Sequence, residues 1–193
     1  MYYPCVVDEL IVDQTVSNAL IRVWPRVTQR AVRLPALPGK ADAVIGPRRA
    51  GKTSLLFAHA AKLLSAPATG LAGPAEISAN AVLYLNFEDE RLAGLQAGQL
   101  QLFMDCWYRR CPGVLQAERW LLLDEIQTVP GWEGFVRRLL DEGGVRIVVT
   151  GSSAKLLSRE IATSLRGRAL TTEVLPFSFA EALVHAGILI PEH

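Results

Sequence analysis

The segment from Gly46 to Ser54 contains the residue types that hold phosphate groups. Its residues GPRRAGKT match GxxxxGK[ST] at every fixed position, after an apolar stretch and at the start of a helical one. Gly46 and Gly51 let backbone N–H groups curl around a phosphate, and a helix start adds partial positive charge. Lys52 is expected to reach the β- and γ-phosphates, and the Thr53 hydroxyl to bind Mg²⁺. An ordinary glycine-rich turn is the other interpretation. The expected phosphate-binding residues are Gly46, Pro47, Arg48, Arg49, Ala50, Gly51, Lys52, Thr53 and Ser54.

Two adjacent carboxylates follow the apolar run WLLL at residues 120–123. At the end of a buried strand, Asp124 is placed to hold Mg²⁺ through a water, and Glu125 to face the γ-phosphate. Glu125 is therefore the expected general base that activates the attacking water. An acid directly after the metal-binding Asp is common in motor and switch ATPases and unusual in small-molecule kinases and GTPases. The alternative without a catalytic role is a strand that ends in a solvated pair of acids.

The segment VVTGSS at 148–153 is a strand that ends in small polar residues. Ligands of open α/β sheets bind beyond the carboxyl ends of the strands, so Thr150, Ser152 or Ser153 is placed to sense the γ-phosphate or the attacking water. A helix N-cap is an equally good interpretation of Ser152 or Ser153.

Two arginines, Arg166 and Arg168, bracket a glycine in SLRGR after a predicted helix. A guanidinium that stabilises charge on the transferring phosphoryl group commonly completes a phosphate site, and a neighbouring subunit can supply it. Both residues are thus candidates for an arginine finger acting in trans. Structural ion pairing is the alternative.

Strand and helix patterns alternate along most of the chain, which predicts right-handed βαβ units and a parallel sheet between two helical layers. The expected strands are 41–46, 81–87, 119–125, 145–151 and 169–175, and the expected helices are 51–64, 92–110, 131–144 and 153–165. The Gly/Pro/Ala/Ser-rich segment 65–80 is predicted to be a loop.

The first 40 residues are less regular. Arginines at 22, 26, 30 and 33 have nearly helical spacing, although Pro25 interrupts the first turn. They form either a basic face that contacts phosphates or, as is more common, the solvated face of a helix.

Composition gives weaker guidance. A net charge of +1 provides no global field to recruit nucleic acid or an anionic membrane, which leaves a local patch possible. Three cysteines without metal-ligand spacing indicate reduced thiols. The first residues lack a signal-peptide pattern, and no apolar run reaches the roughly 18 residues of a membrane span. We therefore expect a cytoplasmic protein that does not enter a membrane.

Together these blocks resemble a known family. GPRRAGKTSLL, YLNFEDER, LLLDEIQTVPGWEGFVRRLLD, VVTGSSAKLLSREIATSLRGR and LPFSFAEAL are similar to the N-terminal ATPase domain of prokaryotic AAA-type proteins, which belong to the additional-strand P-loop ATPases close to the archaeal ATPases. The resemblance covers about Ala41 to Leu183. It implies a three-layer α/β P-loop NTPase sandwich with strand order 5-1-4-3-2, ATP and Mg²⁺ as ligands, and the roles given above for Asp124, Glu125, the Thr150–Ser153 stretch and Arg166 or Arg168.

The resemblance also implies a domain plan. We expect a partly helical N-terminal extension at 1–40, an AAA-type domain at 41–184 and the start of a truncated connection at 185–193. Members of the family normally continue into a C-terminal domain related to restriction endonucleases, so the expected product is a fragment or a truncated chain without that activity.

The expected function is binding and Mg²⁺-dependent hydrolysis of ATP, with ADP as product, by an ATPase that drives or gates the absent domain. A homo-oligomer with a trans-acting arginine, and a DNA or protein partner, are possible extensions. The alternatives are a nucleotide-dependent switch with negligible hydrolysis and a small-molecule kinase, and Glu125 argues against the kinase.

Overall fold

A five-stranded parallel sheet forms the centre of the computed structural model, which describes residues 7–65, 78–116, 118–151 and 163–188. The strands lie in the order β2-β3-β4-β1-β5. Their bounds are β1 Ala41–Ile45, β2 Val82–Asn86, β3 Arg119–Asp124, β4 Val145–Gly151 and β5 Ala169–Glu173. This is the predicted order 5-1-4-3-2 counted from the opposite edge, so the predicted fold class is confirmed. Because the strands are parallel, their carboxyl ends meet at one edge.

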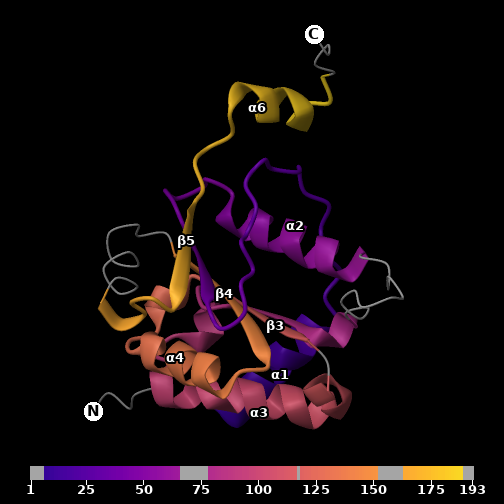
Figure 1. Ribbon diagram of the computed structural model, residues 1–193. Coiled ribbons are helices and arrows are strands. Elements are labelled where there is room, and N and C mark those ends of the chain that lie inside the picture. The colour runs from indigo at the N-terminus through magenta and orange to yellow at the C-terminus, as the bar shows by residue number, and fades with distance from the viewer. Residues whose placement is uncertain (1–6, 66–77, 117, 152–162, 189–193) are drawn as a thin grey trace, which may run out of the picture.

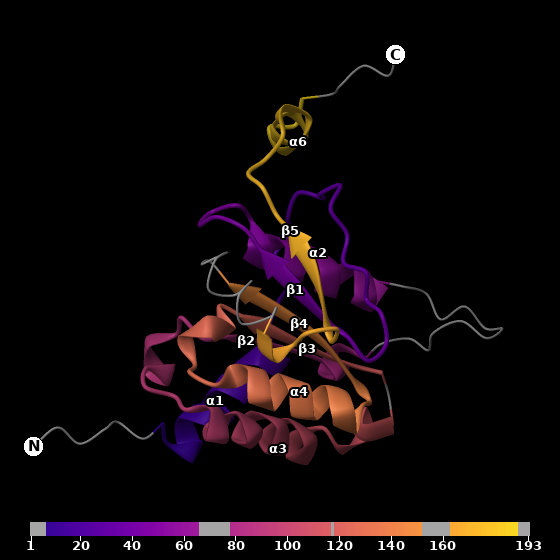
Figure 2. The ribbon, with the colours of Figure 1, turned by 60° about the vertical axis from the view of Figure 1, so that its left-hand side comes forward.

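Helices cover both faces of the sheet, as Figures 1 and 2 show. The bounds are α1 Glu9–Leu20, α2 Lys52–Ser65, α3 Leu100–Arg110, α4 Trp132–Glu142 and α6 Phe179–His185. One face packs against α1, α3 and α4, and forms the larger hydrophobic core. The other face packs against α2 and residues 21–36, which we call the strap. Burial on both faces explains the high apolar content of the strands.

The N-terminal region differs from the sequence pattern. Asp8 caps the N-terminus of α1. The buried residues Val12, Val16 and Ala19 of this helix belong to the larger core. The strap that follows has no regular secondary structure, so its arginines do not share a helical face. Pro25 explains part of this difference, since proline lacks an N–H and disfavours helical backbone in the residue before it.

The helix expected at 92–110 begins at Leu100, after short 3₁₀ turns at Glu90–Leu92 and Ala97–Gln99. Gly94 between them has φ 82°, a conformation that ends helical geometry. The predicted loop 65–80 and helix 153–165 lie mostly outside the described residues. No helix in the described ranges has the length and apolar character needed to cross a membrane.

Asp42 in β1 fastens the strap to the sheet and is only 2% exposed. Its carboxylate oxygens accept the Ala36 N–H at 3.1 and 3.3 Å. Burial raises the pKa of Asp42 to about 6, although the Ala36 N–H and the charge of Arg146 favour the ionised form. The folded protein therefore holds this proton to a higher pH than the unfolded chain, and the stability contributed by Asp42 falls as the pH rises from about 4 to about 6.

We expect Asp42→Asn to raise the free energy of unfolding by about 1 kcal/mol near neutral pH, because asparagine keeps an acceptor for Ala36 without a buried charge. Urea denaturation at neutral pH and at about pH 5 measures the difference, which should shrink in acid. A gain that is equal at both pH values, or a loss at neutral pH, would contradict the assigned cause.

Candidate active site

The loop between β1 and α2 depends on its glycines. Gly46 has φ 150°, and a Cβ there would lie 2.1 Å from the Val174 carbonyl oxygen. Gly51 has φ 93°, and Arg49 is in the left-handed region at φ 63°. These conformations curl the loop before α2 begins at Lys52. The curled backbone at a helix start is the arrangement that the sequence predicted for phosphate binding.

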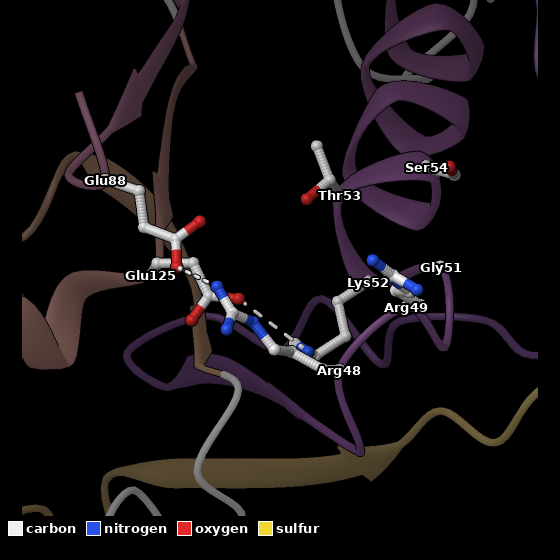
Figure 3. A pocket seen from close by; sticks show the side chains of 8 residues that line it. All are labelled: Arg48, Arg49, Gly51, Lys52, Thr53, Ser54, Glu88 and Glu125. Atoms are coloured by element: carbon white, nitrogen blue, oxygen red, sulfur yellow. Dashed lines mark ion pairs between the residues drawn. The ribbon is translucent and has the colours of Figure 1, made fainter.

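A cavity of about 760 Å³ opens beside this loop (Figure 3). Side chains from the loop, the first turn of α2 and the carboxyl ends of β2 and β3 line it. They are Arg48, Arg49, Gly51, Lys52, Thr53, Ser54, Glu88 and Glu125. Arg48 and Glu88 face each other across it at 3.6 Å as an exposed ion pair, which contributes little stability.

Lys52 is buried in the loop, with 5% of its side chain exposed. Its Nζ donates to the carbonyl oxygens of Gly46 at 3.2 Å and Pro47 at 3.1 Å, and lies 3.7 Å from Oε1 of Glu125. The ammonium group is therefore held at the wall of the cavity, between the loop and the end of β3.

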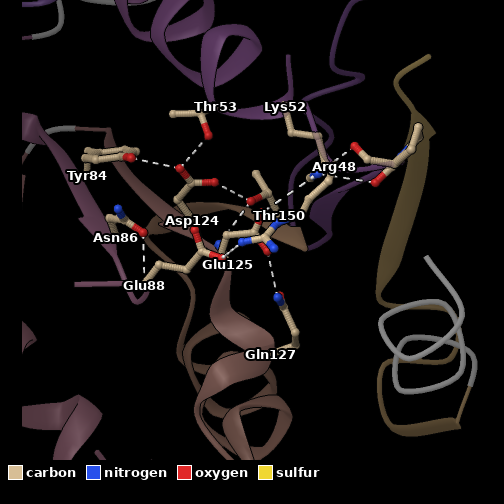
Figure 4. A network of polar contacts seen from close by, with 12 residues as sticks. Arg48, Lys52, Thr53, Tyr84, Asn86, Glu88, Asp124, Glu125, Gln127 and Thr150 are labelled. Atoms are coloured by element: carbon tan, nitrogen blue, oxygen red, sulfur yellow. Dashed lines mark hydrogen bonds and ion pairs between the residues drawn. The ribbon is translucent and has the colours of Figure 1, made fainter. Parts of the chain in front are cut away.

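Asp124 is the centre of a hydroxyl network at the end of β3 (Figure 4). Thr53 Oγ1 and Tyr84 OH both donate to its Oδ2 at 2.8 Å, and Thr150 Oγ1 donates to Oδ1. Asp124 is 2% exposed, so these donors replace water around a buried carboxylate. The network joins β2, β3, β4 and α2 at one point.

Glu125 follows with left-handed backbone at φ 54°, which turns its side chain into the cavity. Its N–H donates to Thr150 Oγ1 at 3.0 Å, and Gln127 Nε2 donates to its Oε2 at 2.7 Å. Its backbone and one carboxylate oxygen are thus both fixed by neighbours. A strained backbone held by hydrogen bonds is typical of functional sites.

The remaining predicted residues are distributed differently. Thr150 is fully buried and bound to Asp124 and Glu125, so in this structure it orients the two acids. Ser152 and Ser153 lie outside the described residues. Arg166 is exposed, and Arg168 pairs with Asp141 of α4 just before β5 begins. This is the opposite end of β5 from the cavity, which neither arginine lines.

The donor set suits Mg²⁺. The hydroxyl of Thr53 and the carboxylate of Asp124 offer hard oxygen ligands 2.8 Å apart. Among the described residues no group of three or more His, Cys, Asp or Glu is arranged to hold a metal ion. Mg²⁺ usually takes one or two carboxylates from a protein and completes its shell with phosphate oxygens and water.

The chain is similar to known proteins over most of its length. A family model described as an AAA domain matches residues 39–183. The chain belongs to this AAA domain family. It is 38% identical over 176 residues to an uncharacterized protein of Methanocaldococcus jannaschii. The aligned region covers 91% of this chain and 34% of that protein.

A second relative is an uncharacterized protein of Haemophilus influenzae, 35% identical over 140 residues, with 72% of this chain and 32% of that protein covered. The chain thus spans about one third of the length of these curated relatives. Among solved structures, PCH-2 of C. elegans matches with a TM-score of 0.46 and 15% identity over 95% of this chain and 46% of that one.

Tyr84 and Gln127 contact the two acids of the site, although no motif in the sequence points to either residue. The available signal for Tyr84 is the period of two in β2, which puts a phenol on the same face as Asn86, the register partner of Asp124. Burial and the neighbouring Asp124 carboxylate raise the pKa of Tyr84, so its hydroxyl stays a donor at neutral pH.

We expect Tyr84→Phe to lower the free energy of unfolding by about 1–3 kcal/mol, because a buried carboxylate loses one of its donors. Denaturant unfolding measures this loss, with Tyr108→Phe as a control tyrosine outside the Asp124 network. Equal losses in both variants would show that the bond from Tyr84 to Asp124 has no special weight.

Proposed function

We propose that this AAA domain binds ATP with Mg²⁺ in the cavity beside the Gly46–Gly51 loop and hydrolyses it. One observation carries the proposal. Lys52, Thr53 and Glu125 line one cavity, and the buried Asp124 accepts a hydrogen bond from Thr53 at its edge. These are the residue types that phosphate chemistry requires, and Lys52 lies within ion-pair distance of Glu125.

Each residue has a distinct part. The loop N–H groups and Lys52 would bind the phosphate chain, for which Lys52 exchanges its bonds to the Gly46 and Pro47 carbonyls. Thr53 and Asp124 would hold Mg²⁺, which when bound supplies positive charge that neutralises the phosphate oxygens. Glu125, oriented by Gln127 and Thr150, would take a proton from the attacking water.

Titration calorimetry with ATP and Mg²⁺, followed by measurement of phosphate release, tests this function. Saturable binding at micromolar concentrations and Mg²⁺-dependent release of phosphate are expected. Release of phosphate that is independent of Mg²⁺, or an absence of ATP binding at millimolar concentrations, would refute the proposal.

A second candidate is a nucleotide-dependent switch whose isolated chain hydrolyses ATP negligibly. The position of Arg166 and Arg168 favours it, since the cavity is lined by Arg48 and Arg49 but by neither of them. Hydrolysis would then require a neighbouring subunit that contributes an arginine, or a DNA or protein partner. Single-turnover assays with and without DNA distinguish the two functions.

If Arg166 or Arg168 acts in trans, specific activity should rise with protein concentration, and replacing the acting arginine by alanine should lower kcat about 10³-fold. Mixing that variant with Lys52→Ala should restore activity, because each chain supplies what the other lacks. Arg138→Ala, which removes an exposed arginine from α4, is the control. Specific activity that is independent of protein concentration, together with no recovery on mixing, would contradict a trans-acting arginine.

A further inference from the structure

Arg30 is a buried arginine in the strap, and it connects two regions far apart in the sequence. Its side chain is 4% exposed. Nη1 donates to the carbonyl oxygen of Ala50 in the phosphate loop at 2.9 Å. Nη2 donates to the carbonyl oxygen of Leu175, after β5, also at 2.9 Å. One planar guanidinium thus bonds both the loop and the chain that leads to α6.

The bond to Ala50 fixes the direction of a functional N–H. The peptide between Ala50 and Gly51 is trans, and the C=O and N–H of a trans peptide point in opposite directions. With the Ala50 carbonyl directed at Arg30, the Gly51 N–H is directed away from Arg30. Gly51 lines the cavity, and a Cβ on it would lie 3.3 Å from Nη1 of Arg30. The guanidinium therefore supports the loop from behind.

The other side of Arg30 holds the first turn of α6. Its Nε and Nη2 donate to the two carboxylate oxygens of Glu181 at 2.7 and 3.2 Å, and its guanidinium carbon lies 4.9 Å from the centre of the Phe177 ring. Arg30 and the Ser178 N–H lower the pKa of Glu181 to about 2, so this carboxylate is charged at neutral pH. Thr28, also in the strap, is hydrogen-bonded to His185 of α6 at 2.7 Å.

Figures 1 and 2 show α6 set apart from the sheet, beyond the carboxyl end of β5. The bonds of Arg30 to Leu175 and Glu181 therefore hold the first turn of α6 close to the phosphate loop. We propose that Arg30 is a positioning residue that couples nucleotide binding at the loop to the placement of α6, an inference that rests on the proposed function. Because such coupling is reciprocal, a partner that binds α6 and changes the affinity for nucleotide would have its own affinity changed by nucleotide by the same factor.

Binding and hydrogen exchange test the coupling in the full chain. We expect Arg30→Ala to weaken binding of MgADP about tenfold, and Glu181→Ala to weaken it by a smaller factor. The double variant should bind like Arg30→Ala alone, since both changes break one connection. MgADP should slow amide exchange in α6 of the unmodified protein and leave it unchanged in Arg30→Ala. A purely structural role for Arg30 predicts no such nucleotide-dependent effect at α6.

Arg146→Ala is the matched control. Arg146 in β4 also anchors the strap, by donating to the Ala36 carbonyl oxygen at 2.9 Å. It pairs with Glu118 at 3.0 Å and does not line the cavity beside the loop. It should leave the affinity for MgADP unchanged. Arg30→Lys should give an intermediate affinity, because one ammonium group cannot reproduce the guanidinium fork. MgADP affinity within twofold of the unmodified protein in Arg30→Ala, with protection of α6 retained, would overturn the proposal.

The same variants separate this inference from the proposed function. Absence of MgADP binding by the unmodified chain would reject the nucleotide site. Exchange of the Gly51 amide in the nucleotide-free protein would then decide the inference. Faster exchange in both Arg30→Ala and Glu181→Ala supports transmission from α6 to the loop, and unchanged exchange in Glu181→Ala refutes it.

Discussion

Replacing Lys52 by alanine should abolish ATP binding at micromolar concentrations. The buried ammonium group lies 3.1 and 3.2 Å from two loop carbonyls and 3.7 Å from Glu125, so a phosphate entering the loop meets a cation that is already in place. Loss of charge-assisted bonds from a buried partner costs about 3–5 kcal/mol, which corresponds to a decrease in affinity of about 10²–10⁴-fold. Titration calorimetry with ATP and Mg²⁺ measures the effect.

The control for this variant is Lys62→Ala, an exposed lysine on the same helix. It should bind ATP like the unmodified chain. Thermal unfolding of both variants shows whether the fold is retained, since Glu125 loses one ion pair when Lys52 is removed. An affinity for ATP within threefold of the unmodified value in folded Lys52→Ala would place the phosphate chain elsewhere.

The second large effect is expected from Glu125→Gln, which should retain ATP binding and lose hydrolysis. Glutamine keeps the size of the side chain and can still bond to Gln127, but its amide cannot accept the proton of an attacking water. General base catalysis typically contributes about 10²–10⁴-fold, so kcat should fall by that factor while Kd changes little. Single-turnover phosphate release and equilibrium titration measure the two quantities separately.

Glu88→Gln provides a matched control, because Glu88 is a second carboxylate in the same cavity. Its side chain is 47% exposed and faces Arg48 at 3.6 Å. Its replacement should change kcat by less than about threefold. Full turnover in Glu125→Gln would remove this residue as the base, and an equal decrease in both variants would point to the charge of the cavity instead.

The fold and the centre of the site could be predicted because their signals are local. The spacing of Gly46, Gly51 and Lys52 defines the loop by itself. Asp124 and Glu125 end a strongly apolar strand, so their position at the edge of the sheet follows from the parallel topology. The proximity of Thr53 to Asp124 then follows, because both lie at the carboxyl end of the sheet.

Other features depend on contacts that the sequence pattern does not contain. Arg30 looks like one member of a helical series of arginines. Two of its partners, Leu175 and Glu181, lie more than a hundred residues later in the chain, and the third, Ala50, lies in the phosphate loop. Tyr84 reads as a core residue of β2 until the sheet places it beside Asp124. Such tertiary partners decide whether a polar side chain in an apolar segment is structural or part of a site.

The most direct test of the ATP site is a crystal structure with a non-hydrolysable ATP analogue and Mg²⁺. We expect the phosphates to lie in the Gly46–Gly51 loop with Lys52 bound to them. Thr53 and Asp124 should surround the ion, and Glu125 should contact a water beside the γ-phosphate. An analogue bound outside the loop, with Lys52 still on the Gly46 and Pro47 carbonyls, would contradict the proposed site.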